Sequence, residues 1–392
     1  MDRPWLQIIG LGEDGLSGLS DASRNAIAQA AVIIGGPRHL ELAQAGARGQ
    51  AWPVPFEVEP ALALRGQAVV VLASGDPFWF GAGGSLVPHL APGEWLAHPA
   101  PSTFALVAAR LGWPLESTAC HGLHAAPFAR LHRDLQNGGR LICLLRDGFA
   151  PQALAAWLTG MGFGASTLNI CEAVGGPRER IRQARADAFD LTDIAAPVAV
   201  AITAKGIGLP RGFGLADDLF AHDGQITKRP IRAMTLSALS PRPGELLWDI
   251  GAGSGSISVE WCLAGGRAQA VEAKPARVEN IRSNAARFGI DHSLTVTRGR
   301  APDALAALPA PDAVFIGGGG DDTLYAVLLP LLRPGTRLVA NAVTLETEAL
   351  LTTLHARHGG TLTKIDIAQT EPLGRMRGWS AARPVVQWSV TL

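Results

Sequence analysis

The sequence predicts an α/β protein built from two domains. The chain has 392 residues, which is more than one hydrophobic core usually organises. Short apolar segments alternate with helix-like segments from residue 5 to about 205, and a second alternating series begins after about 225. Between them, residues 206–225 contain five glycines and one proline and show weak periodicity. We therefore expect one domain at 1–205, a linker at 206–225 and a second domain at 226–392.

In the first half, six segments have the composition of strands, because they are rich in Val, Ile and Leu and are closed by Gly, Ser or Pro. These segments are residues 5–10, 31–35, 68–74, 141–146, 166–173 and 196–203. Helix-like segments lie between them at 20–30, 101–112 and 150–162. This alternation predicts a mostly parallel sheet covered by helices.

The second half shows a similar series. Five strand-like segments separated by helices occupy residues 246–251, 268–273, 293–299, 312–318 and 336–343. The last two apolar segments, 362–370 and 384–392, have no helix-length segment between them. We expect these two to pair as an antiparallel hairpin at the edge of the sheet.

Charge and composition exclude several kinds of partner. The formal net charge is zero, so no global positive field attracts nucleic acid or acidic membranes. No uninterrupted apolar run reaches the roughly 20 residues of a membrane helix, and the first residues lack the pattern of a secretory signal. The four cysteines show no Cys-x-x-Cys spacing, which argues against a disulfide framework and a zinc site. We expect a soluble, cytoplasmic protein.

A metal site is not expected either. Cys120, His121, His124 and His132 lie close together in the sequence, but their spacing matches no standard zinc pattern. Structural roles are therefore expected for these four residues.

The segment LLWDIGAGSGS, residues 246–256, is the strongest single signal. An apolar strand ends in an acid, glycines follow at 251, 253 and 255, and a helix is expected next. Such a turn lets a ligand lie against the backbone, and the helix start offers unpaired N–H groups. The dinucleotide fingerprint Gly-x-Gly-x-x-Gly fails because Ser256 and Ser258 occupy the positions of its third glycine. Glu272 ends the next strand, where an acid can accept hydrogen bonds from ribose hydroxyls.

This order of residues resembles the class I methyltransferases, which have a Rossmann-like fold and use S-adenosylmethionine. The resemblance implies that Asp249 orients the methionyl end of the cofactor and that Glu272 holds its ribose. The loop residues implied to contact the cofactor are Gly251, Ala252, Gly253, Ser254 and Gly255.

The first half carries two further glycine-containing turns. The first strand runs into Gly10-Leu11-Gly12, and the strand at 68–74 ends in Ser74-Gly75-Asp76-Pro77. In parallel sheets, ligands bind at the carboxyl ends of strands. No acid ends the second strand, so the ribose-binding half of a dinucleotide site is absent.

With Phe80-Gly81, Pro101-Ser102, Cys120-His121-Gly122 and the segment 172–181, these motifs resemble the tetrapyrrole methylase family over residues 5–205. That family binds S-adenosylmethionine between two α/β lobes. The resemblance implies cofactor contacts from Gly10, Leu11, Gly12, Ser74, Gly75, Asp76, Gly81 and Ser102. One departure is Glu13-Asp14-Gly15, where the family usually has Pro-Gly.

Residues 222–392 also resemble the small decarboxylating precorrin methyltransferases, through QITKRPIRAMTLSAL, the glycine loop, FIGGGG and VANAVTLE. The resemblance implies that Thr227 helps to close over the cofactor and that Ala301 lies near its adenine. Relatives often have an acid before that alanine, where this chain has Arg300.

The fusion of the two halves resembles the precorrin-6Y (6B) C(5,15)-methyltransferases of cobalamin biosynthesis. It implies one S-adenosylmethionine per domain, precorrin-6B as substrate, methylation of carbons 5 and 15, loss of the ring C acetate carboxyl as carbon dioxide, and precorrin-8 as product. A homo-oligomer is also expected, because related domains associate.

The chemistry requires positioning more than a nucleophilic side chain, so no catalytic residue is assigned. A substrate with many carboxylates favours cationic anchors. The candidate anchors are Lys228, Arg229, Arg232, Arg300, Arg375 and Arg377.

Two other functions stay open from the residues alone. One is a nicotinamide-dependent oxidoreductase acting on a precorrin. The absence of the dinucleotide fingerprint from the second half argues against this function. The other is a precorrin-binding protein in which one domain is inactive, because glycine loops indicate binding capacity and not turnover.

Overall fold

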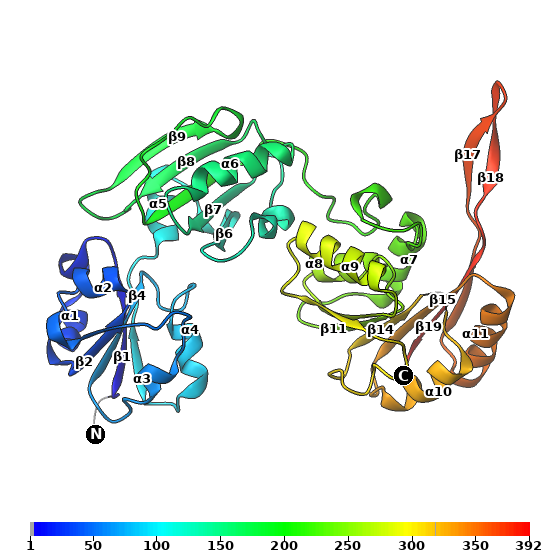
Figure 1. Cartoon of the computed structure of the whole chain (residues 1–392), viewed down its shortest axis with the longest axis horizontal. Coiled ribbons are helices and arrows are strands. Elements are labelled where there is room, and N and C mark those ends of the chain that lie inside the picture. The colour runs from blue at the N-terminus through cyan, green and yellow to red at the C-terminus, as the bar shows by residue number, and fades with distance from the viewer. Residues whose placement is uncertain (1–3, 318) are drawn as a thin grey trace. The chain divides into compact units, whose positions relative to one another are not determined.

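The structure, a computed structural model, describes residues 4–317 and 319–392. Gly318, part of the FIGGGG motif, lies outside the described residues. The chain divides into two compact units (Figure 1). The first comprises the residues up to Phe128 together with Asp134–Gly208, and the second comprises Ala129–Arg133 and Leu209–Leu392.

The first unit begins with an all-parallel sheet of order β3-β2-β4-β1-β5. Its strands are β1 (Leu6–Leu11), β2 (Val32–Gly35), β3 (Gly49–Ala51), β4 (Val69–Ser74) and β5 (Trp95–His98). Helices α1 (Asp21–Gln29), α2 (Pro37–Leu42), α3 (Glu59–Leu62) and α4 (Gly83–Leu86) accompany them. The central strands β1 and β4 are almost fully buried, as expected for a parallel sheet covered on both faces. Their adjacent carboxyl ends bring the two predicted loops together.

The second lobe of this unit corrects one prediction. Its sheet, of order β6-β7-β10-β8-β9, has one parallel pair, β6 with β7, and is otherwise antiparallel. The strands are β6 (Thr118–Gly122), β7 (Arg140–Leu145), β8 (Thr167–Glu172), β9 (Arg180–Arg185) and β10 (Val198–Thr203), with helices α5 (Thr103–Leu111) and α6 (Ala150–Gly160). β7, β8 and β10 were predicted as strands, but the mostly parallel arrangement expected for them is wrong in this lobe. Alternation along the chain does not reveal that β10 returns between β7 and β8.

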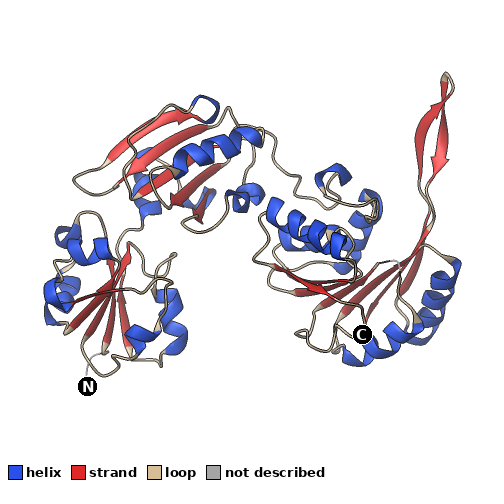
Figure 2. Cartoon of the chain, in the orientation of Figure 1, coloured by secondary structure: helices blue, strands red, loops and turns tan. Residues whose placement is uncertain are grey.

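The second unit is a seven-stranded sheet with helices on both faces (Figure 2). The strand order is β13-β12-β11-β14-β15-β19-β16. The strands are β11 (Leu246–Ile250), β12 (Arg267–Glu272), β13 (Leu294–Arg298), β14 (Ala313–Ile316), β15 (Arg337–Ala342), β16 (Thr361–Ile365) and β19 (Val385–Thr391). Helices α7 (Arg229–Leu239), α8 (Ser256–Leu263) and α9 (Pro275–Arg287) share one core cluster, and α10 (Asp322–Leu331) and α11 (Leu345–His358) share another. The expected class I arrangement is therefore present.

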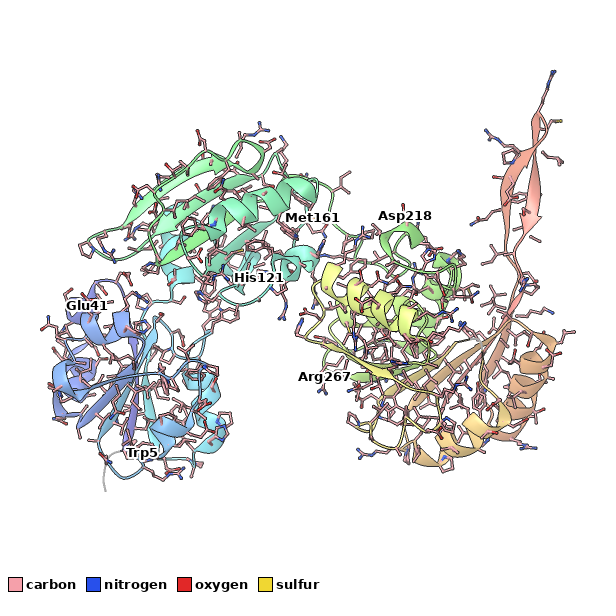
Figure 3. The ribbon with its side chains drawn as sticks, viewed as in Figure 1. Trp5, Glu41, His121, Met161, Asp218 and Arg267 are labelled. Carbon is pink, nitrogen blue, oxygen red and sulfur yellow. The ribbon has the colours of Figure 1, made fainter. Side chains whose placement is uncertain are left out.

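The end of the chain confirms one pairing and adds a hairpin that was not predicted. β16 and β19 pair antiparallel, as expected, with β16 at the edge of the sheet. Between them, β17 (Ala368–Leu373) and β18 (Met376–Ala381) form a separate two-stranded hairpin. It projects from the sheet of the second unit, and the far end of the hairpin has no other element beside it (Figure 3). Leu373, Met376 and Trp379 are 70%, 77% and 78% exposed there.

The segment predicted as a linker belongs largely to the second unit. Leu215 and Phe220 are buried in the core that α7, α8 and α9 share. The backbone N–H groups of Gly214 and Leu215 donate to the carboxylate of Glu260 at 2.7 and 3.0 Å. The composition of 206–225 resembles a linker because its glycines and turns run over a surface, yet its few apolar residues are part of a core. Among the described residues, no helix is both long and apolar enough to cross a membrane.

Candidate cofactor and substrate sites

The glycine loop of the second unit connects β11 to α8. Gly251, Gly253 and Gly255 have φ values of 69°, 60° and 71°. These values lie in the left-handed region of backbone conformation, which is unfavourable for residues that carry a side chain. A Cβ on Gly255 would also lie 2.9 Å from Cγ2 of Ile281 in α9. Glycine is therefore required for the loop to turn tightly beneath α9. Its backbone lies open to a cavity at Gly251, Ala252 and Gly253.

Asp249 is buried at the carboxyl end of β11, with 1% exposure. Its Oδ2 accepts hydrogen bonds from the N–H and the hydroxyl of Ser258, at 3.2 and 2.6 Å. Its Oδ1 has no partner among the described residues. Burial, opposed by the Ser258 bonds and aided by the charge of Glu272, raises the pKa of Asp249 to about 6. An unpaired carboxylate oxygen here fits the amino group that S-adenosylmethionine would bring.

Glu272 ends β12 beside the same loop, with 5% exposure. Its Oε2 accepts the N–H of Gly253 at 2.9 Å, and its Oε1 accepts the N–H of Lys274 at 2.8 Å. The carboxylate thus fixes the middle of the glycine loop to the end of the neighbouring strand. Each oxygen keeps a further lone pair for a ribose hydroxyl, so the arrangement fits the predicted role.

A cavity of about 1390 Å³ adjoins the loop. Ligand pockets usually measure about 300–1000 Å³, so this one has room for a large ligand beside a nucleoside cofactor. The predicted residues that line it are Thr227, Lys228, Arg229, Gly251, Ala252 and Gly253. Asp218, labelled in Figure 3, lines it from the segment before α7.

The prediction that Arg232 anchors substrate is wrong. Its side chain has no exposed surface, and its Nε lies 2.6 Å from Oε1 of Glu260. It also contacts Asp217 at 3.0 Å and the carbonyl of Leu215. Arg232 therefore ties the segment before α7 to α8, because every polar group it carries is used inside the protein.

Other predicted residues lie away from this cavity. Arg300 and Ala301 lie on the segment between β13 and β14, and Arg375 and Arg377 lie on the exposed hairpin. Ser254 is buried with a hydroxyl that has no partner among the described residues. The structure does not bring these residues to the cavity, and their proposed contacts stay predictions.

Arg383 and Asn341 are among the residues that line the cavity and that sequence reasoning missed. Arg383 precedes β19 and has no ion-pair partner among the described residues. Asn341 lies near the end of β15 with 9% exposure. Its only sequence signal is a polar residue inside the apolar segment TRLVANAV. No sequence feature could have singled out Arg383, because single arginines are common in loops.

In the first unit, the two predicted loops meet backbone to backbone. A Cβ on Gly10 would lie 1.7 Å from the carbonyl oxygen of Gly75. Gly75 has a φ of 55°, and a Cβ there would lie 2.6 Å from Cα of Ser102. Ser102 caps α5 by accepting the N–H of Ala105 at 3.1 Å. These predicted residues are therefore brought together, and only glycine fits at positions 10 and 75.

A cavity of about 380 Å³ lies at the same edge of the sheet, lined by the predicted residues Ser74, Gly81 and Ser102. Leu11 is buried in the sheet, and Asp76 accepts the N–H of Phe78 at 2.8 Å. The structure therefore divides the predicted set into cavity-lining residues and residues that shape the loops.

Two histidines line this cavity and were not predicted to do so. His39 Nε2 lies 2.8 Å from the hydroxyl of Ser74. Burial, with the neighbouring Arg38, lowers the pKa of His39 to about 4. The Nδ1 of His124 lies 3.1 Å from the carbonyl oxygen of Leu145, and burial lowers its pKa. Both imidazoles are therefore neutral near pH 7.

Glu13, which stands where the family usually has Pro-Gly, makes contacts through its side chain. Its carboxylate pairs with Arg38, and Nη2 of Arg178 lies 3.7 Å from Oε2. Arg38 also donates to the hydroxyl of Ser74 at 3.3 Å. Glu13 thus ties the first loop to the residues after β2, a link that Pro-Gly has no side chain to make.

Two family models match the two halves of the chain. Residues 6–190 match the tetrapyrrole (corrin/porphyrin) methylases, and residues 218–392 match the precorrin methyltransferase domain. A Sinorhizobium protein named precorrin-6Y C(5,15)-methyltransferase (decarboxylating) is 49% identical over 399 residues, which are 99% of this chain and 96% of that protein.

Two further relatives are shorter. A Pyrobaculum calidifontis protein named probable cobalt-precorrin-6B C(15)-methyltransferase (decarboxylating) is 34% identical over 181 residues, 44% of this chain and 92% of that protein. The crystal structure of the C-terminal domain of precorrin-6Y C5,15-methyltransferase from Rhodobacter capsulatus is 62% identical, with a TM-score of 0.46, and covers 47% of this chain and 100% of that chain. Because the first relative matches along nearly its full length, the chain belongs to the family of decarboxylating precorrin-6Y C(5,15)-methyltransferases.

Proposed function

We propose that this chain carries out the reaction that names its family. It would transfer methyl groups to carbons 5 and 15 of precorrin-6B and remove the ring C acetate carboxyl as carbon dioxide, giving precorrin-8 in cobalamin biosynthesis. The observation that carries the proposal is the presence of two strand-end glycine loops, in two separate units, each beside its own cavity. The comparisons support methyltransferase families in both halves and give no support to the oxidoreductase alternative.

The division of labour follows from the two halves. We assign methylation of carbon 5 to the first unit, and methylation of carbon 15 with decarboxylation to the second. The Pyrobaculum relative supports this assignment, because its name combines carbon 15 with decarboxylation in a protein that matches only 44% of this chain. One cofactor would bind in each unit.

When bound, S-adenosylmethionine supplies a methyl group on a positively charged sulfur. In the second unit, Oδ1 of Asp249 would hold the amino group of the cofactor, and Glu272 its ribose. The backbone of Gly251–Gly253 allows close approach. In the first unit, the close approach of Gly10 to Gly75 holds the two loops together near Ser74 and Ser102, which line the cavity. In both units the chain would contribute orientation and proximity, which suffice for a methyl displacement.

The protein would act as a homo-oligomer in the cytoplasm. An isolated two-stranded hairpin is marginal in water, and β17–β18 exposes Leu373, Met376 and Trp379. These features support association of copies through the hairpin. All four cysteines are free, and three of them are buried, which suits a reducing compartment.

The test is mass spectrometry of the product formed from precorrin-6B and S-adenosylmethionine by the full-length protein. Wild type should add two methyl groups and lose one carbon dioxide. Gly253→Arg fills the second cavity and should leave a product with one methyl group at most and its carboxylate retained. Ser74→Arg places a long side chain in the first cavity and should abolish methylation of carbon 5. A variant that still forms the full wild-type product contradicts the assignment of its site.

A further inference from the structure

The cavity of the second unit has charged and apolar parts. Lys228, Arg229 and Arg383 line it from exposed segments. Arg229 and Arg383 have no ion-pair partner among the described residues, whereas Lys228 lies 3.9 Å from Asp217. We call these three residues the cationic rim. Glu371 and Asp218 also line the cavity, so the rim is suited to separate contacts and not to one uniform positive field.

The apolar part of the cavity lies at the ends of the sheet strands. Five apolar residues line the cavity there, and we call them the apolar wall: Phe315, Val343, Ile365, Ile367 and Val385. Phe315, Ile365 and Val385 are 2%, 7% and 7% exposed. None of the five can neutralise a charge. A carboxylate that touches only these five side chains therefore loses water without gaining a cation.

Asn341 is the polar residue of β15 beside this wall. Its Nδ2 donates to the hydroxyl oxygen of Thr235 at 2.9 Å, and its Oδ1 accepts from Nε2 of Gln387 at 2.9 Å. Gln387 also donates to Thr235 at 3.0 Å. The three residues come from β15, α7 and β19 and are 9%, 0% and 6% exposed. This network fixes the amide at one orientation beside the cavity.

One hydrogen-bond donor of this network is unused. An amide nitrogen carries two N–H bonds, and for Asn341 only the bond to Thr235 has an acceptor among the described residues. The side chain is nine-tenths buried and lines the cavity. Since an unsatisfied buried donor costs free energy, the second N–H is suited to an acceptor on a ligand, such as a carboxylate oxygen.

Decarboxylation requires that one carboxylate of the substrate leaves as carbon dioxide while the other carboxylates are retained. In the step that loses carbon dioxide, the bond between the side-chain carbon and the carboxylate carbon breaks. The electron pair moves into the conjugated macrocycle, and a proton from water is then added to the side-chain carbon. A carboxylate paired with arginine is stabilised as a charged ground state and resists this step. A carboxylate in apolar surroundings, held by one neutral donor, loses charge as the bond breaks and reacts more easily.

We propose that the cavity selects the carboxylate that leaves: the free N–H of Asn341 orients it on the apolar wall, while the cationic rim binds carboxylates that are retained. The inference rests on the proposed function and adds which part of the site discriminates among chemically similar carboxylates. Asn341 contacts substrate, whereas Thr235 and Gln387 are positioning residues that act through it.

The first test places a cation on the wall. Val343 is 48% exposed, so Val343→Lys can be accommodated without filling a core. In the full-length protein with precorrin-6B and S-adenosylmethionine, we expect carbon dioxide release to slow about tenfold, because the new ammonium stabilises the leaving carboxylate. Affinity of the second site for S-adenosylhomocysteine should not change. The control is Val327→Lys on α10, 42% exposed and away from the cavity, which should release carbon dioxide at the wild-type rate.

The second test addresses the positioning network. Thr235→Val removes the acceptor of Asn341, and Thr235→Ser keeps it. We expect Thr235→Val to slow carbon dioxide release about tenfold and Thr235→Ser to restore it. Because two buried amides lose an acceptor, Thr235→Val should also melt at a lower temperature under either role. A merely structural role would in addition weaken the binding of S-adenosylhomocysteine at the second site together with the rate.

The outcomes separate the inference from the proposed function. If wild type neither methylates precorrin-6B nor releases carbon dioxide, the proposed function fails. If wild type does both, and Val343→Lys and Thr235→Val release carbon dioxide at the wild-type rate, the selection of the carboxylate by the wall and Asn341 is wrong while the proposed function stands.

Discussion

Arg232 and Glu260 form an ion pair that solvent does not reach, with side chains 0% and 3% exposed and 2.6 Å between Nε and Oε1. Glu260 also accepts the N–H groups of Gly214 and Leu215. Because Arg232 lies in α7 and Glu260 in α8, these contacts join both helices to the segment before α7 and are a structural element of the second unit.

The first prediction separates this role from substrate binding. Arg232→Met leaves Glu260 buried without its cation, which should destabilise the second unit by about 3–5 kcal/mol. Arg229→Ala, at the cavity, should leave the melting temperature unchanged and raise the KM for precorrin-6B about tenfold. Calorimetry and steady-state kinetics on both variants make the comparison. A stable Arg232→Met variant with a raised KM would show that the buried arginine serves the substrate after all.

The second prediction concerns the contact of Gly10 with Gly75. A methyl group on Gly10 would overlap a backbone oxygen at 1.7 Å, so no side-chain rotation relieves Gly10→Ala. We expect binding of S-adenosylhomocysteine, measured by isothermal titration, to fall from two sites to one per chain. Gly84→Ala is the control, because a Cβ there meets nothing within 4 Å. Two sites retained in Gly10→Ala would contradict the assignment of a cofactor site to the first unit.

The third prediction uses the pKa of Asp249, which burial raises from 3.8 to about 6. A carboxyl group whose pKa is raised by folding favours the folded state below about pH 4, and this contribution is lost as the pH rises to about 6. Asp249→Asn lacks this titration. The free energy of unfolding of the variant, relative to wild type, should therefore rise by about 3 kcal/mol from about pH 4 to about pH 7.

Calorimetry of the full chain without cofactor measures this difference, and the wild type serves as the reference for all other titrating groups. The same variant should bind S-adenosylmethionine more weakly at the second site, because it lacks a carboxylate for the amino group. Identical pH profiles for the two proteins would show that Asp249 keeps an ordinary pKa.

The fourth prediction tests the hairpin. Trp379 lies in β18 and is 78% exposed. Trp379→Asp replaces this exposed apolar side chain with a charged one. If copies of the chain associate there, sedimentation velocity should show a smaller species for this variant than for wild type. Phe149→Asp, at a position 85% exposed in the first unit, should sediment as wild type does. Equal sedimentation of Trp379→Asp and wild type would exclude the hairpin as the contact.

Much of the candidate site could be predicted because it is local in sequence. The glycines at 251, 253 and 255 follow a strand and precede a helix, and the structure shows them at the positive φ that only glycine adopts cheaply. Glu272 could be predicted because the next parallel strand ends at the same edge of the sheet. Arg232 was misassigned because a basic cluster in sequence carries no record of burial.

The sequence by itself determined the two-domain α/β organisation, most of the strands and the glycine loops, because apolar periodicity and turn residues act over a few neighbouring positions. The tertiary structure decided the rest: the mostly antiparallel sheet of the second lobe, the burial of Arg232, and the position of Arg383 and Asn341 at the cavity that the glycine loop also lines. These features join residues up to 150 or so positions apart, as the bond between Thr235 and Gln387 does. Such contacts depend on which strand pairs with which, and that choice is made by the packing of the whole unit.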